Sequence, residues 1–402
     1  MRYIRFITIP TMGIATIVLT FFSITGVACA QNMTEEDLPD FKVRPGYEVT
    51  LAVDNLDNAR FLEMGDDGTL YVSRPRHEDI VGLTDQDGDG FFESRTTYVE
   101  NYSRVHGLHY KDGWLWFTQT GAVHKSRDTD GDGVSNEVET VIPEERIYSK
   151  GGGHWWRSLL VGDDGIYTSI GDGGNISIQT ETERQKIWKY SLDGMEKELF
   201  VSGIRNTEKL RFRPGTDEVW GADHGSDWYG RPIGDTRAQQ PITDHNPPDE
   251  FNHYRKGEFY GHPFIVGNIL PRVEYYDRDD IIDLASKTVP PEWMFGAHVA
   301  TNGFTFVSLE NNHFPPDHQG DAFVAQHGSW NSSVKVGYAV VRVLFDDVTG
   351  DPYGELEIVQ TLADDGETVL ERPVDCVEAP DGSILFSGDH GGRVYRITYT
   401  GR

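Results

Sequence analysis

GDDGTLYVS, residues 65–73, joins a turn rich in Asp and Gly to a short strand of alternating apolar residues, and the same signal recurs along the chain. Turn residues of this kind give tight hairpin geometry, and a period-two apolar pattern after them is typical of a half-buried strand. The other copies are KDGWLWFTQ (111–119), GDDGIYTSI (162–170), PGTDEVWGAD (214–223), HQGDAFVAQ (318–326) and PDGSILFSGD (380–389). The chain therefore repeats one β unit.

The spacing of these copies predicts an all-β fold, a six-bladed β-propeller. The first four copies follow one another at intervals of roughly 50 residues, the size of one four-stranded blade. The next interval is longer, and the stretch 231–300, rich in Pro, His and Asp, is interpreted as a long insertion rather than a lost blade. No long segment combines helical periodicity with caps at both ends. A β-sandwich with a second domain is the structural alternative.

The first 30 residues predict a secretory signal peptide. A basic start (MRYIR) leads into an uncharged apolar run that ends in Ala-Cys-Ala before Gln31. This order is typical of a signal that is cleaved, here after Ala30. A lipoprotein modified at Cys29 and a retained membrane anchor are the alternatives, because the run is almost long enough to span a bilayer. Residues 31–44 are then a linker and 45–402 the propeller of an exported protein, periplasmic or extracellular.

The charge of the chain argues against a nucleic-acid partner. The formal net charge is −29, and removing residues 1–30 takes away two arginines and no acidic residue, which makes it −31. Nucleic-acid phosphates select basic surfaces instead. The processed chain would keep only Cys376, so its core and bound ions, not a disulfide, must hold the fold. Export without disulfides is compatible with a bacterial envelope protein.

Two acidic segments, DQDGDGFFE (85–93) and DTDGDGVSNEVE (128–139), have the spacing of a calcium loop. Alternate carboxylates on a tight turn surround one hard cation with oxygen atoms. The predicted ligands are Asp85, Asp87 and Asp89 in the first loop, and Asp128, Asp130, Asp132 and Glu139 in the second. Position 12 of the first loop is Thr96, so Glu93 is the candidate for its last ligand. We interpret both as structural calcium loops; solvated acidic turns are the alternative.

The stretch 203–263 carries the most specific motifs: GIRNTEKLRFRP, then ADHGSDW, then PPDEFNHYRKGEFYGHP. An Arg-Asn pair precedes a strand-like run, a Gly-containing turn follows the run, and an acidic pair with a downstream Tyr-Gly-x-Pro closes the segment. This order of features resembles the soluble quinoprotein sugar dehydrogenases. Those are six-bladed β-propeller enzymes that oxidise aldoses or sorbosone with pyrroloquinoline quinone (PQQ) and calcium.

The resemblance implies a role for each motif, although turn residues of any propeller are the alternative. In that family the Arg-Asn pair contacts the quinone, backbone carbonyls of the turn hold calcium beneath it, and the acidic pair with the Tyr backbone builds a second calcium site. The implied cofactor contacts are Arg205 and Asn206. The implied metal residues are Gly225, Ser226, Asp249, Glu250 and Tyr260.

His154 is the candidate catalytic base. It lies in GGGHWWR (151–157) ahead of the third repeated strand, and Asp172 follows at the end of that strand. A propeller gathers strand starts around its central channel, where an imidazole can take a hydroxyl proton as a hydride leaves the adjacent carbon. A carboxylate on the other ring nitrogen would fix the tautomer, so Asp172 is expected to orient His154, as in the family. A buried structural histidine is the alternative. Arg157 is a further candidate for the site, with a simple salt bridge as its alternative.

Further segments supply candidate cofactor contacts. Residues 326–346 resemble the HGSWN…GY…VVRV signature of the sorbosone and pyranose dehydrogenase branch, and residues 371–382 resemble the segment in which an arginine clamps a cofactor carboxylate. A guanidinium suits that task because it binds a carboxylate through two parallel hydrogen bonds. Relatives often carry Arg and Lys where this chain has Ser332 and Ala339, so a basic contact is either missing or supplied by Lys335. The candidates are Arg60, His327, Trp330, Asn331, Lys335 and Arg372.

Together these features predict an exported PQQ- and calcium-dependent dehydrogenase of a sugar hemiacetal or aldehyde. No CxxCH occurs, so no haem c is attached and electrons must pass to an external acceptor, a cytochrome or a quinone. A P-loop, a dinucleotide fingerprint and a GxSxG nucleophile are also absent from the sequence. One alternative is a calcium-dependent propeller hydrolase such as a lactonase, which would not need several arginines. The other is a propeller binding module without the cofactor.

Overall fold

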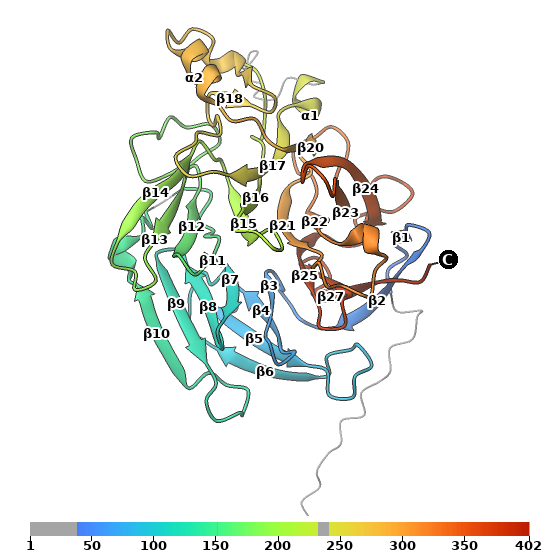
Figure 1. The fold of residues 1–402 in the computed structure, drawn as a ribbon. Coiled ribbons are helices and arrows are strands. Elements are labelled where there is room, and N and C mark those ends of the chain that lie inside the picture. The colour runs from blue at the N-terminus through green and yellow to red at the C-terminus, as the bar shows by residue number, and fades with distance from the viewer. Residues whose placement is uncertain (1–37, 151, 232–240, 402) are drawn as a thin grey trace, which may run out of the picture.

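The structure, a computed structural model, describes residues 38–150, 152–231 and 241–401. Six antiparallel sheets, five of four strands and one of five, form blades around a central axis (Figure 1), and this confirms the predicted six-bladed β-propeller. The predicted signal peptide, with its alternatives at Cys29, lies outside the described residues. Within the described ranges, no helix is both long and apolar enough to cross a membrane.

Each blade runs from an inner strand near the axis to an outer strand at the rim. The first holds β3 (Leu62–Met64), β4 (Leu70–Arg74), β5 (Asp79–Thr84) and β6 (Ser94–Val99); the second holds β7 (Leu108–Lys111), β8 (Trp114–Gln119), β9 (Ala122–Arg127) and β10 (Glu137–Ile142). The third holds β11 (Leu160–Val161), β12 (Ile166–Ile170), β13 (Lys186–Tyr190) and β14 (Lys197–Ser202); the fourth holds β15 (Thr207–Phe212), β16 (Val219–Asp223), β17 (Pro248–Tyr254) and β20 (Trp293–Ala297). The fifth holds β21 (Thr301–Phe306), β22 (Ala322–Gln326), β23 (Ala339–Phe345) and β24 (Pro352–Gln360); the sixth holds β25 (Pro373–Glu378), β26 (Ile384–Gly388), β27 (Arg393–Tyr399) and β2 (Tyr47–Val53).

The two ends of the chain close the ring. Strand β2, the first long strand, is the outermost strand of the sixth blade and pairs antiparallel with β27 near the C-terminus. Strand β1 (Lys42–Val43), in the predicted linker, adds to the edge of the fifth blade by pairing with β24. A closed ring leaves only short, protected strand edges.

The six repeated segments are the second strands of the six blades, β4, β8, β12, β16, β22 and β26. In the first copy the Gly65 amide donates to Thr69 O and the Gly68 amide to Gly65 O, which closes the turn between β3 and β4. Gly68 has φ +85°, a conformation that a residue without Cβ adopts at little cost. The repeats therefore mark the second strand of each blade and not the inner strand.

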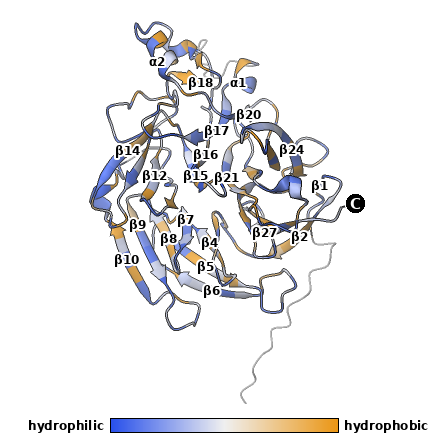
Figure 2. Cartoon of the chain, in the orientation of Figure 1, coloured by the Kyte–Doolittle hydropathy of each residue, from blue (hydrophilic) through white to orange (hydrophobic). Residues whose placement is uncertain are grey.

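Six apolar clusters each join two neighbouring blades and hold the ring together. The cluster between the fourth and fifth blades, for example, packs Trp220 and Phe251 against Phe306 and Phe345. Apolar residues follow the strands, whereas the connecting loops are mostly hydrophilic (Figure 2). Because burial of apolar surface is the main favourable term in folding, the interfaces between blades carry most of the stability.

Charged residues on three inner strands meet at the axis. Lys209 on β15 donates to Asp375 on β25 (2.7 Å) and to Leu62 O, and Arg211 pairs with Glu63 on β3 (2.8 Å). Gly303 on β21 makes room for this network, since a Cβ there would collide with an oxygen of Asp375. The centre of the disc is thus filled by paired charges.

The fourth blade has long connections on both sides of β17. Residues 224–247 contain α1 (Ile242–His245), and residues 255–292 contain β18 (Ile265–Val266), β19 (Leu270–Pro271), a 3-10 turn (Val273–Tyr275) and α2 (Ile281–Lys287), which project from the ring (Figure 1). Two further 3-10 turns lie at Glu144–Arg146 and Pro316–His318. The stretch 231–300 is therefore not insertion alone, because it also contains two strands of the fourth blade.

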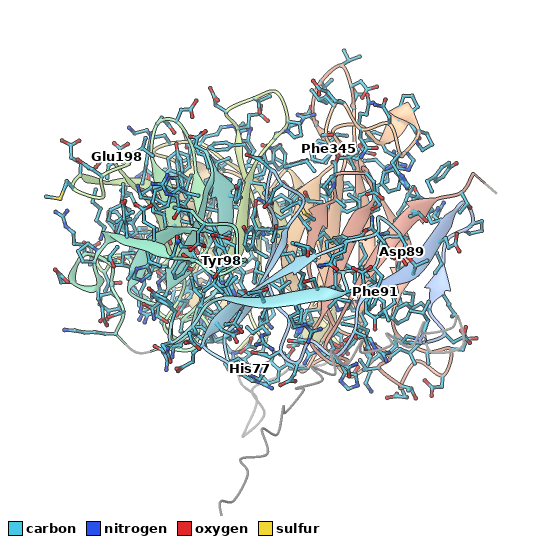
Figure 3. All side chains as sticks on the ribbon, turned by 90° about the horizontal axis from the view of Figure 1, so that it is seen from below. His77, Asp89, Phe91, Tyr98, Glu198 and Phe345 are labelled. Atoms are coloured by element: carbon cyan, nitrogen blue, oxygen red, sulfur yellow. The ribbon has the colours of Figure 1, made fainter. Side chains whose placement is uncertain are left out.

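The antiparallel order defines the two faces of the disc. Inner strands start, and second strands end, on one face, which we call face A; third strands end on the opposite face B. In the edge-on view of Figure 3, His77, just after β4, lies at one face, whereas Glu198 and Phe345 lie toward the other. Residues brought together at the axis on face A come from all six blades.

Candidate active site on face A

His154 lies on face A in the segment leading into β11. Its Nδ1 is 2.8 Å from the backbone carbonyl of Asp172. A carbonyl only accepts hydrogen bonds, so Nδ1 carries the proton and Nε2 holds the free lone pair. Burial, followed by the charge of Arg205, lowers the pKa of His154 to about 3, which keeps the ring neutral. Gly171 permits the contact, since a Cβ there would lie 2.9 Å from the Cβ of His154.

The predicted hydrogen bond between the Asp172 carboxylate and His154 is wrong, because the backbone carbonyl of Asp172 makes this bond and the carboxylate does not. The carboxylate accepts instead from Nε2 of His262 (2.8 Å), from the amides of Gly174 and Ser177, and from the side chain of Gln185. Burial favours the protonated acid, but these donors, His262 first, outweigh it and hold the pKa of Asp172 below its usual range. Asp172 therefore orients His154 through its main chain, while its side chain secures the loop that presents that carbonyl.

Arg60, His327 and Arg372 meet at the axis through Asp389, which follows β26. Arg60 donates to one Asp389 oxygen (2.8 Å) and His327 Nε2 to the other (3.0 Å). Arg372 donates to His327 Nδ1 (2.9 Å), which leaves His327 neutral with its proton on Nε2. Burial lowers the pKa of His327 as well. Within residues 38–150, 152–231 and 241–401, Arg372 makes no ion pair.

Asn206 and Glu208 extend this cluster into the fourth blade. The Asn206 side chain donates to Glu208 (3.0 Å) and lies 3.2 Å from Nδ1 of His224. The other ring nitrogen of His224, Nε2, donates to the Thr301 carbonyl. Glu208 also pairs with Arg60 at 3.3 Å. Although burial raises the pKa of Glu208, His106 and the neighbouring cations hold it low, so the buried carboxylate is charged.

The other two arginines predicted to contact the cofactor, Arg205 and Arg157, are hydrogen-bonded to groups of the protein itself. Arg205 donates to Asn175 and to Asp227 (2.8 Å), and so ties the loop after Asp172 to the turn after β16. Arg157 is buried, and its guanidinium donates to the carbonyls of Tyr148 and Trp156. The prediction that Arg157 contacts the cofactor is not supported, because its donors hold the loop backbone beneath the site.

Three predicted contacts lie on the loop after β22, away from the axis. Trp330 is 73% exposed, Asn331 is partly exposed, and Lys335 forms an ion pair with Glu367 at 2.5 Å. Ser332 donates to Asp244 in α1. The structure therefore does not place Lys335 where it could replace the basic contact that Ser332 and Ala339 lack.

A cavity of about 20 Å³, room for one ion or one water, lies beneath the turn after β16. Gly225, Ser226, Glu250 and Tyr260 line it, so residues predicted for two separate calcium sites meet at one cavity. Asp223, which sequence reasoning missed, lines it as well. Burial and the nearby charge of Asp223 raise the pKa of Glu250 to about 8. Two buried carboxylates at one small cavity fit a hard cation, since a cation removes the repulsion between them.

Asp249, by contrast, does not line this cavity. Its two carboxylate oxygens accept from the amides of Gly225 (2.8 Å) and Thr301 (2.9 Å). The Ser226 hydroxyl binds Trp228 O and Arg272. Asp249 and Ser226 therefore fix the turn with their side chains. Asp223 lines the cavity in place of Asp249, with its oxygens also accepting from the amides of Arg205 and Asn206.

The two acidic loops lie on face B, between third and fourth strands. Asp85, Asp87, Asp89 and Glu93 come close enough to share one cation, as do Asp128, Asp130 and Asp132. The predicted twelfth ligand Glu139 is not in its group, because it lies on β10 and pairs with Lys125 at 2.9 Å. Any cation in these loops is on the opposite face from His154.

Several residues of the cluster were missed: Asp389, Glu208, His106, His224, His262, Trp155 and Trp156. Part of the signal was present, because the second strand is followed by the same His-Gly step in three blades, ADHG (222–225), AQHG (325–328) and GDHG (388–391). Asp223 and Asp389 occupy the same position before this step. His262 gave no such signal, since it returns from the long connection after β17.

Comparison with known proteins places the chain in a family. It belongs to the family described as "Domain of unknown function (DUF7133)", whose model matches residues 33–327. A second model, described as TrAA12-like, matches residues 277–400. A protein of Borreliella burgdorferi described as uncharacterized is 25% identical over 95% of this chain and 96% of its own length.

Solved structures share the fold. A Trichoderma reesei carbohydrate-active enzyme of family AA12, described as an iodide structure, superposes with a TM-score of 0.79 and 19% identity over 92% of this chain and 100% of that one. A calcium structure of the same enzyme gives 0.76. The holo PQQ domain of pyranose dehydrogenase from Coprinopsis cinerea gives 0.76 with 16% identity, over 90% of this chain and 98% of that one.

Proposed function

We propose that this member of the DUF7133 family is an exported quinoprotein dehydrogenase that oxidises the anomeric carbon of a pyranose or a related aldehyde. The observation that carries the proposal is His154, whose Nδ1 proton is held by Asp172 O and whose Nε2 has no hydrogen-bond partner among the residues that the structure describes. Among the solved structures that share the fold is a pyranose dehydrogenase PQQ domain. A bound PQQ would supply the two-electron acceptor.

The protein groups would bind the sugar and move its proton. His154 takes the proton of the anomeric hydroxyl on Nε2, and the resulting imidazolium stays hydrogen-bonded through Nδ1 to Asp172 O. Glu208 and Asp389, both kept ionised, balance the positive charge of Arg60 and of the new imidazolium. Electrons then leave to an external acceptor, because the sequence contains no covalent haem motif.

The donor set at the axis fits an anionic cofactor, through Arg372 in particular. Arg60 is neutralised by Glu208 and Asp389, and Arg205 by Asp227. The Arg372 side chain donates only to the neutral His327 and makes no ion pair with a described residue, although its charge also lowers the pKa of Asp389. A carboxylate is the natural partner for such a guanidinium. Arg372, with Asn206 and His327 nearby in the cluster, would therefore hold a carboxylate of PQQ.

Calcium is proposed for the cavity lined by Asp223 and Glu250. We expect the unfolding free energy of chelator-treated protein to fall as the pH rises from about 5 to 8. Folded Glu250 keeps its proton up to a pKa of about 8, whereas the unfolded side chain loses it near its ordinary value, so rising pH favours the unfolded state. The effect should be roughly 2–4 kcal/mol, and calcium should reverse it.

Melting curves in chelator and in millimolar calcium, at pH 5 and pH 8, test this. The calcium-induced rise in Tm should be larger at pH 8, and Glu250→Gln should remove that difference. The face B loops serve as the control, since Asp130→Asn should lower the calcium response equally at both pH values. An equal response of the native protein at pH 5 and pH 8 counts against calcium at Glu250.

The function itself is tested by adding PQQ and calcium to the purified chain and measuring quinone absorbance, then its bleaching by a panel of aldoses. Binding with sugar-dependent bleaching supports the proposal. Binding without any reduction, or no binding at all, contradicts it and directs attention to lactone hydrolysis, which the same protein is then assayed for.

A further inference from the structure

A pocket of about 460 Å³ opens on face A, between the second blade and the segment that leads into the third. Its walls come from the segment before β7 (Ser103, Arg104), the β8–β9 turn (119–122) and the segment before β11 (143–149). Gly121 lets the two sides approach, since a Cβ there would lie 2.7 Å from the Glu144 side chain. Pockets of 300–1,000 Å³ are typical of small-molecule sites.

Thr120 points to a ligand in this pocket. The residue lines the pocket, is only 9% exposed, and its hydroxyl is buried with no hydrogen-bond partner in the described part of the chain. A buried hydroxyl without a partner costs roughly 1–3 kcal/mol. A hydroxyl of a bound ligand would supply the missing hydrogen bond.

Three further polar side chains that line the pocket, Gln119, His124 and Thr140, are fixed by hydrogen bonds and uncharged. His124 binds Gln119 Oε1 through Nε2 and Thr140 Oγ1 through Nδ1, both at 3.0 Å, and Gln119 donates to Ser103 O. Burial lowers the pKa of His124 to about 4, so the ring is neutral at neutral pH. Neutral donors and acceptors select a polyhydroxyl compound over an ion.

The rim carries one charge of each sign, Arg104 and Glu144. Neither forms an ion pair with any residue that the structure describes. Arg104 has φ +56°, which is uncommon for a residue with a side chain, and its guanidinium lies 5.4 Å from the Trp155 ring centroid. The opposite charges balance, so the rim favours a neutral ligand.

Two tryptophans connect the pocket with the axis. Beyond Arg104, the ring centroids of Trp155 and Trp156 are 3.6 Å apart, and Arg60 stacks on Trp156 at 4.6 Å. Trp156 also contacts His106, which adjoins Glu208. A ligand with one end in the pocket and the other at the axis would therefore cross this tryptophan pair.

We propose that the pocket is a second sugar subsite, which holds a neutral pyranose unit of an oligosaccharide whose reducing end reaches His154. The substrate class is then a neutral oligosaccharide rather than a free monosaccharide. The reducing-end placement rests on the proposed function, whereas binding of a neutral glycan by Thr120 and its neighbours does not.

The test is calorimetric titration of the purified chain with methyl glycosides of maltotriose, cellotriose and chitotriose, and of the matching monosaccharides. The methyl group blocks the anomeric carbon, so binding is measured without oxidation. At least one trisaccharide should bind ten or more times tighter than its monosaccharide, and a tenfold difference corresponds to about 1.4 kcal/mol of binding free energy. Thr120→Val should weaken that trisaccharide by about 3- to 10-fold.

Thr168→Val is the matched control. Thr168, on β12, also has a buried hydroxyl without a partner in the described residues, but it does not line the pocket, so its variant should bind the trisaccharide like the native protein. Equal affinity for mono- and trisaccharides, or native affinity in Thr120→Val, overturns the subsite. Thr120-dependent binding without PQQ-dependent oxidation of any free sugar would uphold the subsite and overturn the proposed function. PQQ-dependent oxidation of a free sugar without tighter binding of any trisaccharide would overturn the subsite and uphold the proposed function.

Discussion

Replacing His154 with Ala is expected to lower the rate of sugar oxidation by about 10²–10⁴, the usual contribution of a positioned general base. The reason is geometric: Asp172 O holds the Nδ1 proton, so Nε2 is the one basic atom that the ring presents. Stopped-flow reduction of the bound quinone by aldoses measures this step directly. PQQ affinity should change little, since the axial arginine and histidine contacts do not involve His154.

His77→Ala is the control, because that imidazole is exposed and pairs with Asp57 on the same face without touching the cluster. It should leave the reduction rate unchanged. If His154→Ala reduces the quinone as fast as the native protein with every reactive sugar, His154 is structural.

The pH profile gives a second measurement on the same residue. An unperturbed histidine would make the rate rise with pH near 6.5. Burial lowers the pKa of His154 to about 3, so the base is already neutral at pH 5 and the rate should stay flat from pH 5 to pH 8. A rate that rises tenfold per pH unit below 6.5 would show that His154 titrates there, contrary to its burial.

The repeat was predictable because the second strands are long enough to show a pattern. Strands such as β12 and β26 have five residues each, all buried, after a turn with its own sequence signal. The inner strands were not recognised, since β11 has two residues and β3 three, too few for an alternating pattern. In addition, inner strand β15 carries charged residues because it faces partners across the axis.

The site was predictable as a set of residues but not as a set of contacts. Arg60 and Asp389 are 329 positions apart and meet because the ring closes. His262 reaches Asp172 because the segment after β17 runs beside the end of β14, with a parallel bridge between Ser202 and Phe259. A single sequence does not encode such pairings locally, so the choice between the Asp172 carbonyl and carboxylate could not be made from it.

Arg372→Ala is expected to weaken PQQ binding by about 30-fold to several thousand-fold, which corresponds to roughly 2–5 kcal/mol. A cofactor carboxylate that loses its guanidinium in a desolvated site stays buried and unpaired, and that penalty dominates the loss. The variant should not unfold, because the Arg372 side chain donates only to His327 and forms no ion pair with a described residue. The charge of Arg372 also helps to lower the pKa of Asp389, but that carboxylate keeps its hydrogen bonds from Arg60 and His327. Titration of the quinone into cofactor-free protein, followed by absorbance, gives the dissociation constants.

Comparison with two other arginines separates cofactor binding from folding. Arg127→Ala, which breaks a pair with Glu137 on outer strands of the second blade, should bind PQQ like the native protein. Arg60→Ala should lower the Tm of the cofactor-free protein, because it leaves Glu208 with one cation fewer in a buried site. Arg372→Ala should instead keep that Tm and bind PQQ more weakly. The PQQ affinity of Arg372→Lys should lie between those of Arg372→Ala and the native protein. If Arg372→Ala binds PQQ with native affinity, Arg372 does not contact the cofactor, because a lost contact to a PQQ carboxylate would weaken binding.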